Sequence, residues 1–220
     1  MVKKAAASVP TAANGGLTRG HKKKARTRKQ LIEAAMRIYA RQGAAELALN
    51  QLAEEAGLSN GTVYNYFRSK EEVLDAVGIS LAEELSVEVT ALSRDLTSGA
   101  ERIAVGVRSF MLHAIQDPQW ANALVSVVHY AEGMRSLLAA NVRSDLQLGA
   151  KQGDLHYENE ELAMLMVVSI TTGAMQALSE AEMPDDYDCI VAEMVLMALG
   201  LERKNARASA FGPMPDSISS

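Results

Sequence analysis

Apolar residues recur every three to four positions along most of the chain, the spacing that gathers side chains on one face of an α-helix. The first clear stretch contains Leu31, Ala35, Ile38 and Tyr39, and Gly43 follows it where a glycine is typical of a helix end. No segment keeps up the strict alternation of apolar and polar residues that indicates a half-buried strand. The pattern therefore predicts an all-α protein.

Local capping signals divide this pattern into separate helices. Thr27 precedes Gln30, and Ser69 precedes Glu72, at the spacing of a capping box. Asp117 precedes a proline that suits the first position of a helix. We expect helices over residues 27–43, 49–56, 60–67, 70–93, 100–115, 118–130, 134–151, 158–180 and 185–202.

Charge divides the chain into a basic and an acidic part. Residues 1–80 carry 13 Lys or Arg and 7 Asp or Glu, whereas residues 81–220 carry 9 and 20. The basic part favours a polyanionic partner, which the acidic part would repel. We expect four segments, namely a disordered basic arm over 1–24, a small helical domain over 25–70, a larger helical domain over 71–204 and a disordered tail over 205–220.

Composition and missing motifs argue against several classes of protein. The single cysteine, Cys189, excludes an intramolecular disulfide and a cysteine-based zinc site, and it suits the cytoplasm. The uncharged run from Leu162 to Ser179 contains polar side chains and is bracketed by glutamates, which favours a buried helix over a membrane span. No phosphate-binding loop, nucleophile elbow or paired-histidine motif is present, so we expect no enzyme, no metal and no other cofactor.

Residues 49–67 have the pattern of a helix-turn-helix, with Gly57 in the turn and Ser59 as a good N-cap of the second helix. Only Val63 and Phe67 of that second helix need to face inward. Its other side chains are uncharged hydrogen-bonding groups, where a solvated helix normally carries Lys and Glu. The pattern favours a nucleic-acid surface over the alternative, an ordinary corner between helices. The exposed set comprises Ser59, Asn60, Thr62, Tyr64, Asn65 and Tyr66, and Lys70 begins the next helix.

Residues 27–35 read TRKQLIEAA, and residues 52–74 read LAEEAGLSNGTVYNYFRSKEEVL. Together these stretches resemble the N-terminal domain of the TetR/AcrR family of bacterial transcriptional regulators. The resemblance implies an all-α homodimer, in which each protomer has a three-helix DNA-binding domain and a larger regulatory domain. The last two helices would pair with those of the partner protomer. The implied function is binding to a palindromic operator, usually as a repressor, with release by a small molecule.

The resemblance also implies roles for individual residues. Tyr64 and Tyr66, with Thr62 and Lys70, match positions that contact backbone phosphates, and Asn60 matches a variable position that reads bases. The complete set of candidate DNA-binding residues is Thr27, Ser59, Asn60, Gly61, Thr62, Tyr64, Asn65, Tyr66 and Lys70.

Two positions depart from the family pattern. Ala44 stands where an aromatic residue usually follows the glycine that ends the first helix, and Ala48 stands where a threonine often caps the second helix. Loss of that cap costs about 1 kcal/mol and removes a phosphate contact. Asn50 is the residue that could replace it.

The larger domain carries candidates for a ligand pocket and for a dimer interface. Aromatic side chains and methionines suit an irregular apolar cavity, although core packing is the alternative for each methionine. The pocket candidates are Phe110, Met111, His113, Trp120, His129, Tyr130, Met164 and Met166. Two strongly apolar helices near the C-terminus favour burial between two protomers, the alternative being the centre of one bundle. The interface candidates are Met175, Ile190, Met194, Met197 and Leu201.

We therefore expect a homodimeric transcriptional regulator that binds an operator in double-stranded DNA and is released by a small hydrophobic molecule. The alternative is a helical ligand-binding or scaffolding module that does not bind DNA. Retention on heparin until raised salt would distinguish the two, because the second kind of protein has no polyanion-binding surface.

Overall fold

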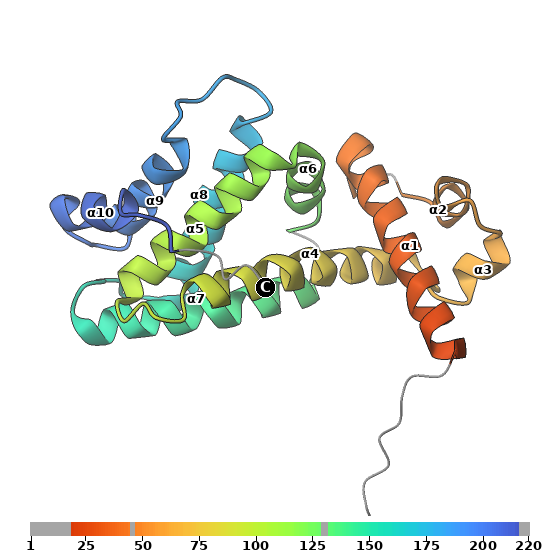
Figure 1. Cartoon of the computed structure of the whole chain (residues 1–220), viewed down its shortest axis with the longest axis horizontal. Coiled ribbons are helices and arrows are strands. Elements are labelled where there is room, and N and C mark those ends of the chain that lie inside the picture. Colours follow the sequence, from red (N-terminus) through yellow and green to blue (C-terminus); the bar gives the residue numbers. More distant parts are fainter. Residues whose placement is uncertain (1–18, 45–46, 129–131, 216–220) are drawn as a thin grey trace, which may run out of the picture.

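The computed structural model describes residues 19–44, 47–128 and 132–215, and no strand occurs among them (Figure 1). This confirms the all-α fold class. The helices are α1 (Arg19–Gln42), α2 (Leu49–Ala56), α3 (Asn60–Tyr64), α4 (Lys70–Leu92), α5 (Gly99–Gln116), α6 (Pro118–Val127), α7 (Glu132–Gln152), α8 (Glu160–Ala177), α9 (Tyr187–Ala198) and α10 (Arg203–Ala210).

Helices α1, α2 and α3 form a small domain at one end of the molecule, and α4 runs from it into the larger bundle (Figure 1). The centre of the small domain consists of fully buried side chains, among them Leu31 and Ile38 from α1, Leu52 from α2 and Val63 from α3. Phe67 follows α3 and is also buried. The two inward positions predicted for the short helix are therefore confirmed, although α3 ends at Tyr64 and not at Phe67.

The first helix begins earlier than predicted. It starts at Arg19, so the expectation of disorder over 1–24 is wrong for residues 19–24, while residues 1–18 lie outside the described part. The capping box at Thr27 does not form, because Thr27 lies inside the helix and its hydroxyl donates to the carbonyl of Lys23 at 3.1 Å. Gln30 instead donates from Nε2 to the carbonyl of Ala56, which ties α1 to the end of α2 at 2.8 Å.

The larger bundle is built around α5, which packs against α7 and α9, while α7 lies alongside α4 (Figure 1). A close approach of two glycines sets the contact of α5 with α7, since a Cβ on Gly99 would lie 2.2 Å from the backbone nitrogen of Gly149. Helix α6 lies between the bundle and α1, and Ser126 donates to the carbonyl of Tyr39 at 3.3 Å. The bundle thus reaches the small domain through both α4 and α6.

The C-terminal segment is ordered where disorder was expected. Residues Arg203–Ala210 form α10, and Phe211 packs under the guanidinium of Arg207. In the interior, Arg108 of α5 donates to a carboxylate oxygen of Asp188 at 2.7 Å and to the carbonyl of Gly212 at 2.6 Å. The disordered tail predicted over 205–220 is therefore wrong for residues 205–215, and residues 216–220 lie outside the described part.

Two of the predicted interface residues belong to the core of their own chain. Met175 and Leu201 are only 2% and 8% exposed in the single protomer, so neither presents a free surface to a partner. Leu201 also lies beyond the end of α9, which stops at Ala198 shortly before Gly200 adopts a φ of 86°. The uncharged run from Leu162 to Ser179 forms most of α8, and among the described residues no helix combines the length and hydrophobicity needed to cross a membrane.

Candidate nucleic-acid interface and internal cavity

The turn between α2 and α3 is fixed by backbone geometry and a cap. Gly57 has a φ of 65°, a left-handed conformation that favours glycine, and the amide of Leu58 donates to the carbonyl of Ala53 at 2.9 Å. The hydroxyl of Ser59 then accepts from the amide of Thr62, which confirms Ser59 as the N-cap of α3. Burial of Val63 beneath this short helix leaves the rest of its surface facing outward.

The outward face of α3 is polar, uncharged and unevenly exposed. Asn60, Gly61 and Asn65 are exposed, and Tyr64 is 58% exposed, an unusual position for so large an aromatic side chain. Tyr66 is only half-buried and packs partly against the core. Tyr64 is therefore the more available of the two tyrosines.

The remaining predicted DNA-binding residues lie on three different helices, α3, α4 and α1. Lys70 is exposed at the first position of α4, whose N-cap is Ser69. Thr62 is half-buried and its hydroxyl lies 2.9 Å from that of Ser59, so these two groups already satisfy each other in part. Thr27 is half-buried on α1, with its hydroxyl bonded to its own helix.

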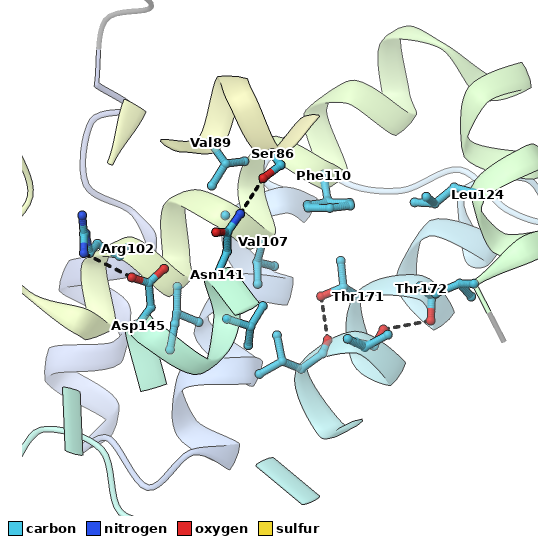
Figure 2. A pocket seen from close by; sticks show the side chains of 16 residues that line it. Ser86, Val89, Arg102, Val107, Phe110, Leu124, Asn141, Asp145, Thr171 and Thr172 are labelled. Carbon is cyan, nitrogen blue, oxygen red and sulfur yellow. Dashed lines mark hydrogen bonds and ion pairs between the residues drawn. The ribbon is translucent and has the colours of Figure 1, made fainter. Parts of the chain in front are cut away.

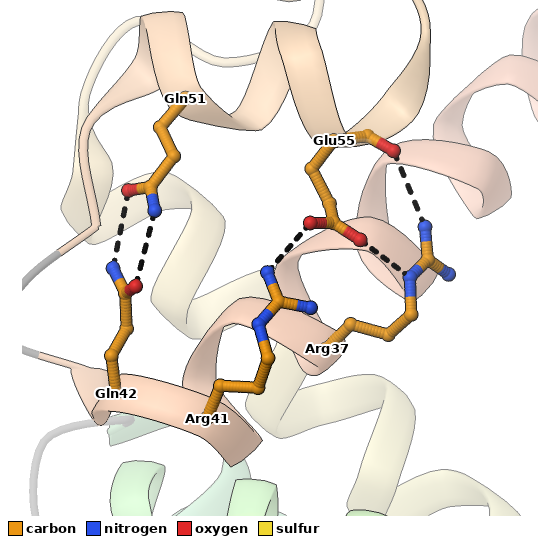
Figure 3. Close-up of polar contacts among 5 residues, drawn as sticks. All are labelled: Arg37, Arg41, Gln42, Gln51 and Glu55. Atoms are coloured by element: carbon orange, nitrogen blue, oxygen red, sulfur yellow. Dashed lines mark hydrogen bonds and ion pairs between the residues drawn. The ribbon is translucent and has the colours of Figure 1, made fainter.

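A polar clamp on the outer surface joins α1 to α2 (Figure 3). Glu55 accepts from Arg37 Nε at 2.8 Å and from Arg41 at 2.6 Å. The side-chain amides of Gln42 and Gln51 exchange two hydrogen bonds of 3.2 Å each. Hydrogen bonds from Arg41 and then Arg37 lower the pKa of Glu55 from 4.5 to about 2. The clamp thus holds α2, and with it the start of α3, at a set position on α1.

The second helix lacks a side-chain cap, as its sequence predicted. Ala48 has the extended backbone of an N-cap residue but no side-chain oxygen to accept a hydrogen bond. Asn50 is exposed inside α2 and does not serve as the cap. Asn50 therefore does not replace the missing cap.

The larger domain encloses a cavity of about 80 Å³ between five helices (Figure 2). Its walls are mostly apolar, and the hydroxyls of Thr171 and Thr172 donate to carbonyls of their own helix at 2.8 Å. The lining residues are Ser86 and Val89 of α4, Arg102, Ile103, Gly106, Val107 and Phe110 of α5, Leu124 of α6 with Val128 just after it, Asn141, Val142 and Asp145 of α7, and Val167, Val168, Thr171 and Thr172 of α8.

Two polar contacts interrupt this apolar lining (Figure 2). Asn141 donates to the hydroxyl of Ser86 at 2.5 Å, and Arg102 Nη1 donates to Asp145 at 3.3 Å. Burial raises the pKa of Asp145, and the nearby guanidinium opposes that rise. The cavity therefore offers one small polar region in an otherwise apolar space.

Among the predicted pocket residues that the structure describes, one lines this cavity. Phe110 lines the cavity, and Trp120 of α6 packs against Phe110. The ring centroid of His113 lies 4.4 Å from that of Trp120. Met111 is fully buried in the core, so core packing, the alternative weighed for the methionines, describes its position. The structure also does not place Met164 or Met166 in the lining, and His129 and Tyr130 lie outside the described residues. The lining residues on α4 and α7 were missed because no local motif marks them.

No cluster of three or more His, Cys, Asp or Glu side chains that could hold a metal ion occurs in the described ranges. Cys189 is buried with its sulfur 3.6 Å from a carboxylate oxygen of Asp188. Burial, the largest cause, raises the pKa of this thiol, which disfavours the reactive thiolate.

Comparison with protein families assigns both parts of the chain. A model described as bacterial regulatory proteins of the tetR family matches residues 31–77. A model described as the tetracyclin repressor-like C-terminal domain matches residues 98–210. The chain belongs to the TetR family of bacterial regulatory proteins.

Curated relatives agree over part of their length. The HTH-type transcriptional regulator SrpR of Pseudomonas putida is 39% identical over 93 residues, which cover 42% of this chain and 41% of SrpR. The HTH-type transcriptional regulator BetI of Rhizobium meliloti is 28% identical over 134 residues, which cover 56% of this chain and 64% of BetI. The chain thus spans between 41% and 64% of the length of these two relatives.

Solved structures resemble the chain more completely. RolR in complex with its ligand resorcinol superposes with a TM-score of 0.72 and 27% identity, over 89% of this chain and 98% of RolR. A TetR family regulator from Shewanella sp. PV-4 has a TM-score of 0.67 over 79% of this chain and 97% of its own, but at 15% identity it shows the shared fold alone.

Proposed function

We propose that this protein is a homodimeric transcriptional repressor that binds a palindromic operator through α3 of each protomer and leaves it when a small molecule enters the cavity. The observation that supports this most directly is the outward face of α3, which exposes Tyr64 and two asparagines and no charged side chain. Such groups reach phosphates and base edges in the major groove, which is wide enough to admit a helix.

A second copy of the chain is the partner that α8 and α9 suit best. These helices pack on each other, and each exposes large apolar side chains. On α8 Leu162 and Leu165 are 63% and 59% exposed, and on α9 Met194 and Met197 are 56% and 43% exposed. A two-fold axis through this surface would bury all four on both protomers in a four-helix interface. The interface proposed here keeps Met194 and Met197, together with the half-buried Ile190, and replaces the buried residues Met175 and Leu201 with the two leucines.

The cavity suits a small, mostly apolar molecule that carries a hydroxyl group. The apolar walls favour a hydrocarbon or aromatic body. A hydroxyl both donates and accepts, so it can bond to the Asp145 carboxylate and the Arg102 guanidinium without disturbing the neutral charge of that pair. RolR, whose solved complex contains resorcinol, supports a ligand of this size and kind.

The helices that line the cavity also reach the DNA-binding domain. Ser86 and Val89 lie on α4, which begins directly after the helix-turn-helix, and Leu124 lies on α6, which packs on α1. A ligand that displaces either helix changes the separation of the two α3 helices in the dimer. Docking into successive major grooves requires about 34 Å between them, so a shift of a few ångströms disfavours simultaneous binding.

The experiment that tests DNA binding compares two substitutions at one position. A duplex is first selected from a random-sequence pool by the purified protein. Tyr64→Ala is expected to weaken binding of that duplex at least tenfold in a gel shift, since it removes the exposed ring and hydroxyl. Tyr64→Phe removes only the hydroxyl and keeps the ring, so it should retain part of the affinity for the duplex. A folded Tyr64→Ala variant with undiminished affinity would refute the assigned contact.

The experiment that tests the cavity compares two substitutions at Gly106, which lines it. A Cβ at this position meets its first neighbour, Val89, at 3.7 Å, so Gly106→Ala fits without strain. Gly106→Leu extends a larger side chain from the same position and is expected to abolish release of DNA by resorcinol or a related phenol, with operator affinity retained. If the same phenol still releases DNA from the Gly106→Leu variant, the effector binds outside this cavity.

A further inference from the structure

The charged side chains of the N-terminal part of α1 are not among the predicted DNA-binding residues. Residues 19–29, called here the basic extension, read RGHKKKARTRK and form the first turns of α1. They contain seven Lys or Arg and no acidic residue. They also precede Leu31, the first residue matched by the family model of the N-terminal domain.

The charges of the basic extension are exposed and uncompensated over most of its length. At its base, Lys29 forms an ion pair with Glu33 at 3.7 Å. Within the described part of the chain, no acidic side chain forms an ion pair with Lys22, Lys23, Lys24 or Arg26, all of which are exposed. Like charges three and four residues apart on a helix repel one another. A polyanion would reduce this repulsion, so a partner of opposite charge suits the basic extension.

The basic extension has a fixed direction relative to the recognition helix. The Arg28 guanidinium lies 5.7 Å from the centre of the Phe67 ring, and Phe67 is buried directly after α3. Gln30 bonds to the end of α2 from the next turn. In Figure 1 the N-terminal end of α1 projects beyond the three-helix domain on the side of α3. When α3 lies in a major groove, the extension is therefore held near the same duplex.

We propose that the basic extension binds backbone phosphates of the DNA that flanks the groove occupied by α3. This inference rests on the proposed function. The extension is about 15 Å long at 1.5 Å per residue, enough to lie along several phosphates. A helix is too wide for the minor groove, which is about 6 Å across, so the contacts are with phosphates and not with base edges there. The extension then adds affinity and lengthens the protected site without changing the sequence that is read.

The test measures how operator affinity depends on salt. The probe is the duplex selected by the wild-type protein, and the variant combines Lys22→Gln, Lys23→Gln and Lys24→Gln in the full chain. Each lost phosphate contact lowers the slope of log affinity against log salt by about 0.9, so the magnitude of the slope is expected to fall by between about 1 and 3. Hydroxyl-radical footprinting should show a shorter protected stretch with the centre unchanged. A repeated selection should return the same sequence.

A matched triple variant controls for net charge. Arg94→Gln, Lys151→Gln and Lys204→Gln remove the same charge from exposed positions of the larger domain and should leave the slope unchanged. An unchanged slope in the Lys22–Lys24 variant, or an equal fall in the control, would overturn the inference even if Tyr64→Ala still abolishes binding. A wild-type protein that selects no duplex would overturn the proposed function itself, and the inference with it. Circular dichroism of both variants excludes loss of helix as the cause.

Discussion

Each of the two domains contains an arginine–carboxylate contact between its helices, but the two contacts lie in opposite surroundings. In the small domain of α1, α2 and α3, Arg37 and Arg41 bind Glu55 at the surface, with the arginine side chains 41% and 53% exposed (Figure 3). In the larger domain, Arg108 and Asp188 are only 12% and 7% exposed and join α5 to α9. Water competes for the first contact and is largely excluded from the second.

This difference in exposure to water determines how much each contact contributes to the stability of the fold. An exposed ion pair contributes at most about 1 kcal/mol, because water and salt screen it. Breaking a buried pair leaves an unpaired charge in the interior and costs about 3–5 kcal/mol. We therefore expect the larger domain to be sensitive to loss of a single charge and the small domain to tolerate it, since the core around Leu31 and Leu52 carries most of the small domain's stability.

The largest expected effect comes from the buried pair. Asp188→Ala leaves the Arg108 guanidinium without its carboxylate and should lower the free energy of unfolding by about 3–5 kcal/mol, measured by urea denaturation. Asp95→Ala is the control, because Asp95 is exposed in a turn. If Asp188→Ala lowers the free energy of unfolding by less than about 1 kcal/mol, the buried pair contributes no more than an exposed one, and the two domains do not differ in this respect.

The same contrast separates what the sequence could and could not predict. The helix-turn-helix followed from local signals, such as the glycine in the turn, the cap at Ser59 and the inward spacing of Val63 and Phe67, and the structure confirms all of these. Ser69 and Asp117 likewise cap α4 and α6, as predicted. Signals within a few residues of one another are sufficient for such features.

The features that sequence reasoning missed depend on contacts between distant residues. The cavity forms where five helices meet, and Asn141 and Asp145 become recognisable as its polar region only once α7 lies beside α4 and α5. The C-terminal segment has the small and polar composition of a disordered tail, but the carbonyl of Gly212 accepts from Arg108, 104 residues earlier. Methionines were also poor markers of the pocket, since an apolar flexible side chain fits a packed core equally well.

A smaller effect is expected at the surface clamp, and it should depend on pH. Glu55→Gln removes the carboxylate and should lower the free energy of unfolding at pH 7 by about 1 kcal/mol. The folded pKa of about 2 lies below the ordinary value of 4.5, so the carboxylate stabilises the fold fully above pH 4.5 and loses this contribution as the pH falls toward 2. The difference between wild type and variant should therefore shrink over that interval.

Urea denaturation at a series of pH values measures this difference. Glu54→Gln is the matched control, because Glu54 is the exposed neighbour of Glu55 on the same helix. A difference that stays constant from pH 7 to pH 3 would mean that the two arginines do not hold the Glu55 carboxylate in its ionised form.

The smallest expected effect concerns the uncapped start of α2, and it separates stability from DNA binding. Ala48 already has the extended backbone of an N-cap, so Ala48→Ser and Ala48→Asp can each supply the missing acceptor and should raise the free energy of unfolding by about 0.5–1 kcal/mol. If the start of α2 faces backbone phosphates, the serine preserves or improves operator affinity, whereas the aspartate repels the phosphates and weakens it. Two variants of equal stability and equal operator affinity would show that α2 lies away from the DNA. The DNA interface would then be confined to α3, the start of α4 and the basic extension, because the new cap at position 48 would have changed the free energy of unfolding without changing operator affinity.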